Sequence, residues 1–338
     1  MMIRTCRCHE ISDDISNVSL DDVDLPPPDA DEVQVRVMAC SVNFPDLLMI
    51  QGKYQFKPPM PFAPGGEIAG DVVAVGEGVT GLAPGDRVVA GTRYGGFSEA
   101  MNVPAEAVKP IPGNLTYAKA ASYGTAYLTA WVALTIRGNL QAGETLLVHG
   151  ATGGVGMAAV DIGKHLGATV IATGGTDEKL AVVKDRGADH VINYTQADGS
   201  LGGFRDVAKE LTDGNGADVI YDPVGGSVFD ESMRCINWGG RILTIGFTSG
   251  TWPKAPVNLI LIKQIAVIGV RAGEIGRRDP ALGARVRQEL YDLLADGSID
   301  PYVCAGFPLD DAVAAMKMLE NRQVVGKCVV TMNGYSVD

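Results

Sequence analysis

The chain has 338 residues, of which 46% are hydrophobic and 20% charged, so it is long enough for about two soluble, globular domains. Its formal net charge of −12 and the absence of any Lys/Arg run argue against a nucleic-acid partner, and no apolar stretch approaches the ~20 residues that span a bilayer. Glycine is abundant, with 43 residues, whereas there are only four histidines. The six cysteines include no C-x-x-C pair and the N-terminus has no apolar signal-peptide core, which predicts a cytoplasmic protein with reduced thiols and no membrane partner.

The first part of the chain, up to about residue 120, alternates short apolar runs with Pro and Gly clusters, a pattern typical of an all-β module. Residues 32–40 and 67–79 show the period-2 alternation of strands most clearly. Residues 116–138 follow as a helical stretch that is apolar on more than one face, which predicts a buried helix.

From Glu144 onward the pattern changes to strands that alternate with helices. The predicted strands cover 145–151, 169–174, 190–194, 217–226, 240–247 and 265–270, and the predicted helices cover 153–167, 177–187, 203–212 and 228–237. This alternation predicts right-handed parallel crossovers and a doubly wound, six-stranded parallel sheet. An amphipathic helix at 280–297 comes next, and the sequence pattern of the β module resumes at 302–332. We therefore expect an α/β protein in which a nucleotide-binding domain is inserted into a discontinuous β domain.

A glycine-rich loop directly follows the first of these strands. Residues 151–156 read A-T-G-G-V-G and open the next predicted helix. Glycines let a backbone approach a pyrophosphate closely, and a helix N-terminus offers unpaired N–H groups to it. We therefore predict that Gly153, Gly154 and Val155 bind a dinucleotide.

The end of the second predicted strand carries no carboxylate. An NAD site usually has Asp or Glu there to accept from the ribose 2′-hydroxyl, but this strand ends in Gly174-Gly175-Thr176. The absence of a carboxylate leaves room for the 2′-phosphate of NADPH, which Lys179 could bind as a cation and Thr176 as a hydrogen-bond donor. NADH stays the alternative, because one of the acidic residues at 177–178 could turn towards a ribose.

Further cofactor contacts are expected where the fourth and fifth predicted strands end. In open α/β sheets the ligand lies at the carboxyl ends of the strands. Val224 follows the fourth strand, and Gly246, Phe247 and Thr248 follow the fifth.

Several segments together resemble the medium-chain dehydrogenase/reductase superfamily, in its zinc-independent branch and in the style of NADPH:quinone oxidoreductases of the zeta-crystallin type. The segments that carry this resemblance are 41–54, 64–89, 95–100, 149–156, 190–194, 222–226 and 324–330. The resemblance implies a GroES-like substrate domain, over 1–125 and 271–338, and a Rossmann domain that binds NADPH, over 126–270. It also implies homodimers, or tetramers of dimers, which pair through the strand at 265–270.

The resemblance also implies roles for individual residues. Tyr194 and Lys179 would lie near the 2′-phosphate, and Thr129 near the nicotinamide. From the β domain, Asn43 and Tyr54 would face the nicotinamide pocket as catalytic candidates. Two plainer interpretations stay open: Tyr54 could be a pocket wall, and Asn43 could cap a loop.

Departures from the zinc branch point to an enzyme without metal. The family's zinc enzymes carry a cysteine ligand where Asn43 stands and a histidine ligand where Gly66 stands. Glu67 remains, but one carboxylate does not hold a catalytic zinc ion. We predict no metal site.

Without zinc there is no Lewis acid to polarise an alcohol, which favours hydride transfer to an electron-poor small-molecule acceptor. The first hypothesis is an NADPH:quinone oxidoreductase. The second is a reductase of α,β-unsaturated carbonyls or enoyl-CoA thioesters, with Tyr54 as proton donor and Asn43 bonded to the carbonyl. The third is a non-catalytic, crystallin-like NADPH-binding protein. Arg271 could meet an anionic substrate such as a CoA phosphate, or form an ion pair at a dimer surface.

Overall fold

The computed structural model describes residues 1–113 and 115–337, and these form two compact units. Unit 1 comprises Met1–Gly124 together with Pro301–Asp338, and unit 2 comprises Thr125–Asp300. The chain thus leaves unit 1, builds unit 2 as one continuous stretch and returns, as the change of sequence pattern predicts.

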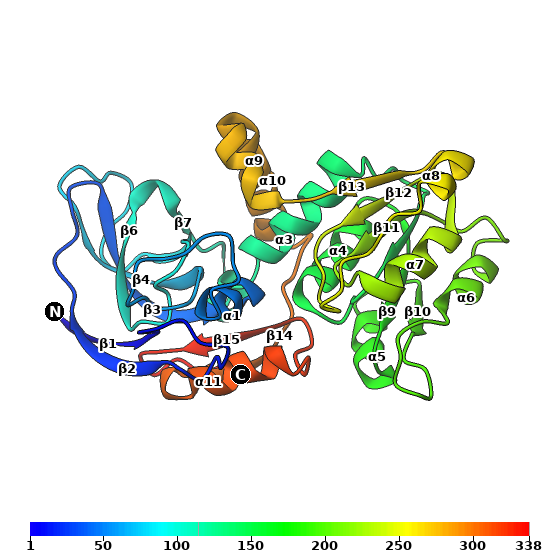
Figure 1. Cartoon of the computed structure of the whole chain (residues 1–338). Coiled ribbons are helices and arrows are strands. Elements are labelled where there is room, and N and C mark those ends of the chain that lie inside the picture. The colour runs from blue at the N-terminus through cyan, green and yellow to red at the C-terminus, as the bar shows by residue number, and fades with distance from the viewer. Residues whose placement is uncertain (114, 338) are drawn as a thin grey trace. The chain divides into compact units, whose positions relative to one another are not determined.

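Unit 1 is built around a mostly antiparallel sheet. Within the described residues its strand order is β14-β15-β3-β4-β5-β7, with β6 also paired to β3, and a separate hairpin joins β1 to β2 (Figure 1). The strands are β1 (Met2–Arg7), β2 (Ser19–Asp24), β3 (Glu32–Ser41), β4 (Glu67–Val75), β5 (Arg87–Gly91), β6 (Ala100–Pro104), β7 (Val108–Pro110), β14 (Val303–Pro308) and β15 (Lys327–Thr331). The helices are α1 (Phe44–Ile50), α2 (Tyr117–Ala120) and α11 (Ala312–Glu320), with 3-10 turns at Ala105–Ala107 and Leu309–Asp311.

The central strand β3 packs into the hydrophobic core of unit 1. Val33, Val35 and Val37 alternate along β3 and are fully buried, so one face of the strand packs into the core. Phe97 and Ile68 complete the same cluster from neighbouring segments.

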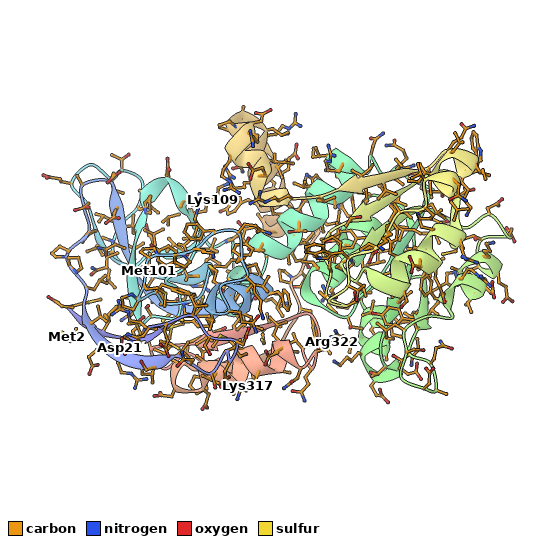
Figure 2. All side chains as sticks on the ribbon, in the orientation of Figure 1. Met2, Asp21, Met101, Lys109, Lys317 and Arg322 are labelled. Atoms are coloured by element: carbon orange, nitrogen blue, oxygen red, sulfur yellow. The ribbon has the colours of Figure 1, made fainter. Side chains whose placement is uncertain are left out.

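The hairpin β1–β2, labelled by Met2 and Asp21 in Figure 2, was not predicted from the sequence. Its second strand reads SLDDVD, which is mostly polar and exposed and so gives no strand signal.

Unit 2 is a doubly wound α/β structure, which confirms the predicted fold class. All neighbouring strands are parallel, in the order β10-β9-β8-β11-β12-β13 among the described residues, and helices cover both faces of the sheet (Figure 1). The strands are β8 (Thr145–Val148), β9 (Thr169–Gly174), β10 (His190–Asn193), β11 (Ala217–Asp222), β12 (Ile236–Thr244) and β13 (Ala266–Gly269). The helices are α3 (Gly124–Trp131), a π-helix (Val132–Arg137), α4 (Gly154–His165), α5 (Asp177–Asp185), α6 (Phe204–Glu210), α7 (Gly226–Cys235), α8 (Val257–Lys263), α9 (Ala272–Arg278) and α10 (Pro280–Ala295).

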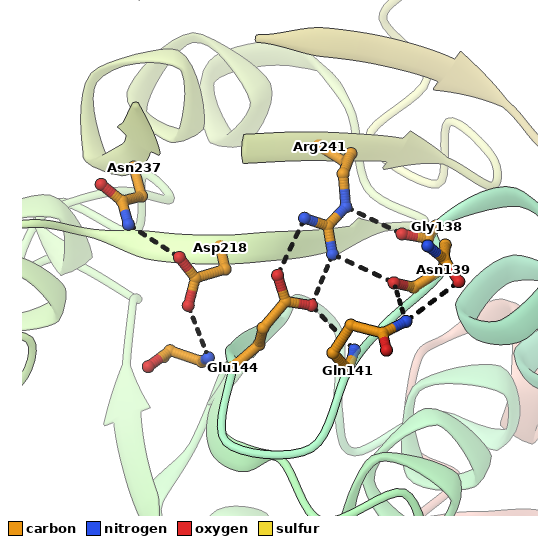
Figure 3. Close-up of polar contacts among 8 residues, drawn as sticks. Gly138, Asn139, Gln141, Glu144, Asp218, Asn237 and Arg241 are labelled. Carbon is orange, nitrogen blue, oxygen red and sulfur yellow. Dashed lines mark hydrogen bonds and ion pairs between the residues drawn. The ribbon is translucent and has the colours of Figure 1, made fainter. Parts of the chain in front are cut away.

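A polar clip joins three strands of unit 2 to the end of the π-helix (Figure 3). Arg241 on β12 binds both carboxylate oxygens of Glu144, at 2.9 and 2.5 Å, and donates to the carbonyl of Gly138 at 2.8 Å. Asp218 on β11 accepts from the backbone N–H of Thr145 at 2.8 Å. A guanidinium–carboxylate pair of this bidentate kind fixes geometry as well as adding energy, so the clip holds the residues after the π-helix against the sheet.

Residues 271–300 group with unit 2, although the sequence analysis assigned them to the β domain. Val286, Leu290 and Leu294 give α10 a buried apolar face. On the same helix Glu289 accepts from the indole N–H of Trp131 at 3.0 Å. The boundary after residue 300 was not readable from the sequence, because an amphipathic helix packs equally well on either kind of domain.

In the part of the chain that the structure describes, every helix is too short or too polar to cross a bilayer.

Candidate functional site

The glycine-rich loop lies at the carboxyl end of β8, as predicted. Gly153 caps α4, and Gly154 and Val155 form the first turn, where helix geometry leaves backbone N–H groups without partners in the helix. A Cβ at Gly156 would lie 2.2 Å from the Gly150 carbonyl oxygen, so only glycine allows this close approach of helix and strand. At Gly153 the nearest atom would be 3.5 Å away. The loop therefore has both the tight packing and the open backbone that a pyrophosphate requires.

The end of β9 lies beside the residues that follow β10. Gly174 pairs in register with Asn193 of β10, and Tyr194 donates its backbone N–H to Gly174 at 3.1 Å. The Thr195 hydroxyl donates to the carbonyl of Gly175 at 2.8 Å. Tyr194 is buried, with its ring centroid 6.5 Å from that of His149.

The space available for a side chain differs between the two glycines at this strand end. A Cβ at Gly174 would meet Thr152 Cγ2 at 2.8 Å and Leu180 Cδ2 at 2.9 Å, so its absence is a packing requirement. A Cβ at Gly175 would meet only Thr195 Oγ1, at 3.6 Å, which is an ordinary contact. Position 175 is therefore the one where a carboxylate would fit and is missing.

The first turn of α5 holds Thr176, Asp177 and Lys179 in fixed roles. Thr176 caps the helix by accepting from the Lys179 backbone N–H at 3.4 Å. Asp177 accepts from the side-chain amide of Asn193 at 3.0 Å, so this carboxylate is directed to β10. The pKa of Glu178 is lowered by its own backbone N–H and by the Thr176 hydroxyl. Lys179 is partly buried on the same turn.

The loops after β11 and β12 are bonded to each other. Thr248 donates its backbone N–H to Pro223, and Ser249 donates to Val224, each at 3.0 Å. A positive φ of 71° at Gly225, and a Cβ that would lie 3.1 Å from the Phe247 ring, require glycine there. Phe247 is 41% exposed, whereas the Val224 side chain is buried in the core of unit 2. Of the predicted cofactor residues in these loops, Phe247 and Thr248 are exposed, whereas Val224 is buried.

Thr129 lies on α3, just before the π-helix. Its hydroxyl donates to the carbonyl of Thr125 at 2.7 Å, one turn back along the helix. The π-helix that follows is marked by the wide-turn bond from Gly138 N–H to the Ala133 carbonyl, at 2.7 Å. Such turns often occur at functional sites.

His149, immediately before the glycine loop, is a structural residue. It is fully buried, and its ring nitrogens lie 2.9 Å from Thr173 Oγ1 and 2.8 Å from Ser232 Oγ. Because Ser232 donates its hydrogen to the Val228 carbonyl, we assign the ring proton to Nε2. Burial lowers the pKa of His149 to about 3, so the ring is neutral and unsuited to proton transfer near pH 7.

In unit 1, Asn43 lies in a buried network of charged groups. Its amide nitrogen donates to Glu67 Oε2 at 2.7 Å, and its amide oxygen accepts from the Lys327 ammonium at 2.6 Å. The carboxylate and the ammonium thus dictate the orientation of the amide. Asn43 is also the N-cap residue of α1, and its backbone N–H donates to Asp46 Oδ2 at 2.8 Å. The structure thus shows Asn43 at the start of a helix with its amide oriented by two charged groups, and its catalytic role stays a prediction.

Lys327 is a residue that the sequence analysis missed. It is 6% exposed, and its ammonium also donates to the Val42 carbonyl at 3.1 Å. Burial raises the pKa of the neighbouring Asp46 to about 6, although bonds from two backbone N–H groups act in the opposite direction. Lys327 lies in the motif VVGKCVV, which supported the family resemblance. The sequence around it does not indicate that this lysine contacts Asn43, which is far away along the chain.

Tyr54 is partly buried against the core of unit 1. Its backbone N–H donates to Leu48 at 3.1 Å, which fixes the turn after α1. Among the described residues its hydroxyl has no hydrogen-bond partner. A Cβ at Gly66 would lie 3.3 Å from the Thr92 carbonyl oxygen, so this position has little room for a side chain.

The two units and the glycine-rich loop define a two-domain oxidoreductase of the dinucleotide-binding class. A family described as the alcohol dehydrogenase GroES-like domain matches residues 29–113, and one described as zinc-binding dehydrogenase matches residues 154–287. The chain belongs to the medium-chain dehydrogenase/reductase family, which confirms the predicted resemblance.

Three similar proteins illustrate the range of this family. A "quinone oxidoreductase-like protein 2 homolog" of Nematostella vectensis is 39% identical over 302 residues, which cover 88% of this chain and 81% of that protein. The structure of Escherichia coli quinone oxidoreductase complexed with NADPH has a TM-score of 0.83 at 30% identity, covering 97% of this chain and 99% of that one. The structure of CurK enoyl reductase has a TM-score of 0.86 at 26% identity and covers 98% and 99% of the two chains.

Proposed function

We propose that this protein is a zinc-independent, NADPH-dependent reductase that passes a hydride to a quinone. The observation that carries the proposal is the buried Lys327 ammonium, 2.6 Å from Asn43 Oδ1. In the family's zinc enzymes a metal ligand stands where Asn43 does, and here a fixed positive charge already occupies that neighbourhood. A second cation beside it would be repelled at low dielectric.

The residues of unit 2 fit NADPH. Gly153, Gly154 and Val155 would hold the pyrophosphate through backbone N–H groups, and the carboxylate-free Gly175 would leave room for the 2′-phosphate. Lys179 would supply the positive charge beside it. The complex of the similar Escherichia coli enzyme with NADPH supports this assignment.

A Lys179→Glu variant tests the cofactor assignment. We expect its Michaelis constant for NADPH to rise at least about tenfold while that for NADH changes little, because only NADPH carries the 2′-phosphate. Direct titration of NADP⁺ by calorimetry provides a readout that does not depend on turnover. Unchanged NADPH preference would overturn the role of Lys179.

When bound, NADPH supplies the hydride. For a quinone acceptor, the chain's residues need only to orient the ring and exclude water, because the reduced product is aromatic. For an enone or enoyl thioester, the resulting enolate also needs a proton. The Tyr54 hydroxyl, without a partner among the described residues, favours this second candidate function, as does the similarity to CurK enoyl reductase.

An acceptor panel separates the hypotheses. NADPH oxidation is followed with 9,10-phenanthrenequinone, a short enal and crotonyl-CoA. We expect the quinone to be the best acceptor, and Tyr54→Phe to reduce turnover of the enal and of crotonyl-CoA much more than that of the quinone. Equal losses would count against proton donation by Tyr54, and NADPH binding without any turnover would favour a crystallin-like role.

We further propose that the protein is a cytoplasmic homodimer, or a tetramer of dimers, that pairs through β13. Within the described residues β13 bonds only to β12, so its outer edge offers backbone groups to another strand. Val257, Leu261 and Ile262 on the preceding helix are 74%, 78% and 69% exposed, an apolar surface that a second copy would cover.

A further inference from the structure

Unit 2 contains an arginine-rich cavity that includes Arg271, for which the sequence left open an anionic substrate or an ion pair. Its volume is about 260 Å³, and it is lined by Val132, Arg137, Gly269, Arg271, Glu274, Ile275 and Arg278. Three arginines and one glutamate are thus among its lining residues. The volume lies just below that of pockets that enclose whole drug-sized ligands, but it accommodates a phosphate or carboxylate group with part of its carrier.

The positive charge around this cavity is only partly neutralised. Glu274 is shared among Arg271 at 3.4 Å, Arg277 at 2.7 Å and Arg278 at 3.1 Å. Bonds from Arg278 and the neighbouring guanidiniums lower the pKa of Glu274, so it is ionised at neutral pH. One negative charge thus faces three positive ones, and Arg137 adds a fourth that has no carboxylate partner within the described residues. An arginine fork is suited to bidentate binding of carboxylate or phosphate.

The cavity walls come from two well-held segments. Arg137 ends the π-helix, and the next residue, Gly138, is bound to β12 by Arg241. The other wall begins at the end of β13, where Gly269 pairs with Thr244 and Val270 donates to Thr244 at 3.0 Å. The cavity is therefore positioned by the sheet itself.

Its place along the sheet relates it to the reaction. β9, with the proposed 2′-phosphate site, and β13, with the cavity, lie on opposite sides of the glycine-rich loop after β8. A dinucleotide with its adenosine end at Gly175 would extend its reactive end towards β12 and β13. Thr244, beside the cavity, is followed two residues later by Gly246 of the predicted cofactor groove.

We propose that this cavity binds an anionic group, a carboxylate, sulfonate or phosphate, carried by the electron acceptor. Arg137 and Arg278 are its main ligands, and Arg271 completes the set. This proposal rests on the proposed reductase function and narrows its substrate class to acceptors with a negative charge away from the reducible bond.

The test compares a neutral acceptor with its anionic analogue, 1,2-naphthoquinone with 1,2-naphthoquinone-4-sulfonate. Each variant is judged by the ratio of kcat/KM for the two, which removes their intrinsic difference in reactivity. We expect Arg137→Gln and Arg278→Gln each to lower the sulfonate-to-neutral ratio about tenfold relative to wild type. Added salt should lower the wild-type ratio and affect the variants less.

Arg277→Gln is the matched control, because Arg277 shares Glu274 but does not line the cavity. Its ratio should change much less than that of Arg278→Gln. Calorimetric titration of the sulfonate into the NADP⁺-saturated protein adds a readout independent of turnover, and binding should weaken in the lining variants only.

The outcomes separate this proposal from the reductase function. If both quinones are reduced and the ratio is the same in all variants, the anion site is overturned and the reductase stands. If neither quinone is reduced, the reductase function fails, and calorimetry alone decides whether the cavity binds the anion. Equal effects of Arg277→Gln and Arg278→Gln would show a general surface field rather than a site.

Discussion

At the scale of single residues, Gly174 and Gly175 illustrate how adjacent glycines differ in what they permit. Gly175→Asp adds a side chain in open space, 3.6 Å from Thr195 Oγ1, and restores the carboxylate that an NAD site uses. We expect a folded protein whose preference, measured as the ratio of kcat/KM values, moves from NADPH towards NADH by at least about tenfold. Gly174→Asp is the control: its Cβ meets Thr152 and Leu180 at under 3.0 Å, so it should lower the melting temperature instead.

His149 makes the stability of unit 2 depend on pH. Its pKa falls from 6.5 in the unfolded chain to about 3 in the folded one, so its contribution is present above pH 6.5 and lost as the pH falls. Between pH 6.5 and about pH 5 this amounts to about 2 kcal/mol of unfolding free energy. His149→Gln, which cannot take up a proton, should show a shallower decline in urea unfolding over this range. Parallel curves for the two proteins would contradict the assignment.

Lys327 is the buried cation of the polar network around Asn43 in unit 1. Lys327→Met removes the buried ammonium that binds Asn43 and interacts electrostatically with the buried Asp46, and should cost about 3 kcal/mol of unfolding free energy. Lys317→Met removes an exposed lysine of α11 (Figure 2) and should change stability by less than about 0.5 kcal/mol. Denaturant unfolding of both variants checks this. No local pattern predicts the network, because its members come from β15, β4 and the start of α1.

At the scale of elements, sequence patterns locate the regular strands and helices of unit 2 well. A strand buried on both faces reads as a short apolar run, and a covering helix ends in glycine, as at Gly167 and Gly187. Helices α8 and α9 were missed for opposite reasons. VNLILIK in α8 is apolar and exposed, so its periodicity carries no burial signal, and AGEIGRR in α9 is short and contains two glycines.

The exposed face of α8 gives a prediction about assembly. Replacing Leu261 and Ile262 together by Asp places charge on the apolar surface beside β13, so we expect dimers to dissociate at micromolar concentration. Analytical ultracentrifugation measures this directly. Val207→Asp, at a 40% exposed position on α6, is the control and should leave assembly unchanged. A dimer that survives the double substitution would place the interface elsewhere.

At the scale of the whole molecule, the order β domain, nucleotide domain, β domain was predictable because the hydrophobic period changes twice. The position of the second change was not, since α9 and α10 carry no sheet pattern, and the contacts of Glu289 with Trp131 and of Asp300 with Arg186 join residues far apart in sequence. Likewise, the glycine loop was predictable from a local motif. The arginine-rich cavity draws on residues separated by more than a hundred positions and becomes visible only in the fold.

Metal removal tests the predicted zinc independence of the protein. The described residues contain no group of three His, Cys, Asp or Glu side chains placed to hold a metal ion, and the Lys327 ammonium lies 2.6 Å from Asn43 Oδ1. We expect dialysis against EDTA to leave quinone reduction unchanged, and elemental analysis to find well under one zinc ion per chain. Loss of activity that Zn²⁺ restores would refute zinc independence.

The discontinuity of unit 1 has a consequence for how the protein is made. Unit 2 is continuous from Thr125 to Asp300, so all of its strands leave the ribosome before β14 and β15 do. Since domains generally fold as units during synthesis, unit 2 can close while unit 1 still lacks two strands and Lys327. Until β15 arrives, Glu67 and Asp46 have no buried ammonium beside them. The nascent chain should therefore complete unit 2 first and the polar network of unit 1 last.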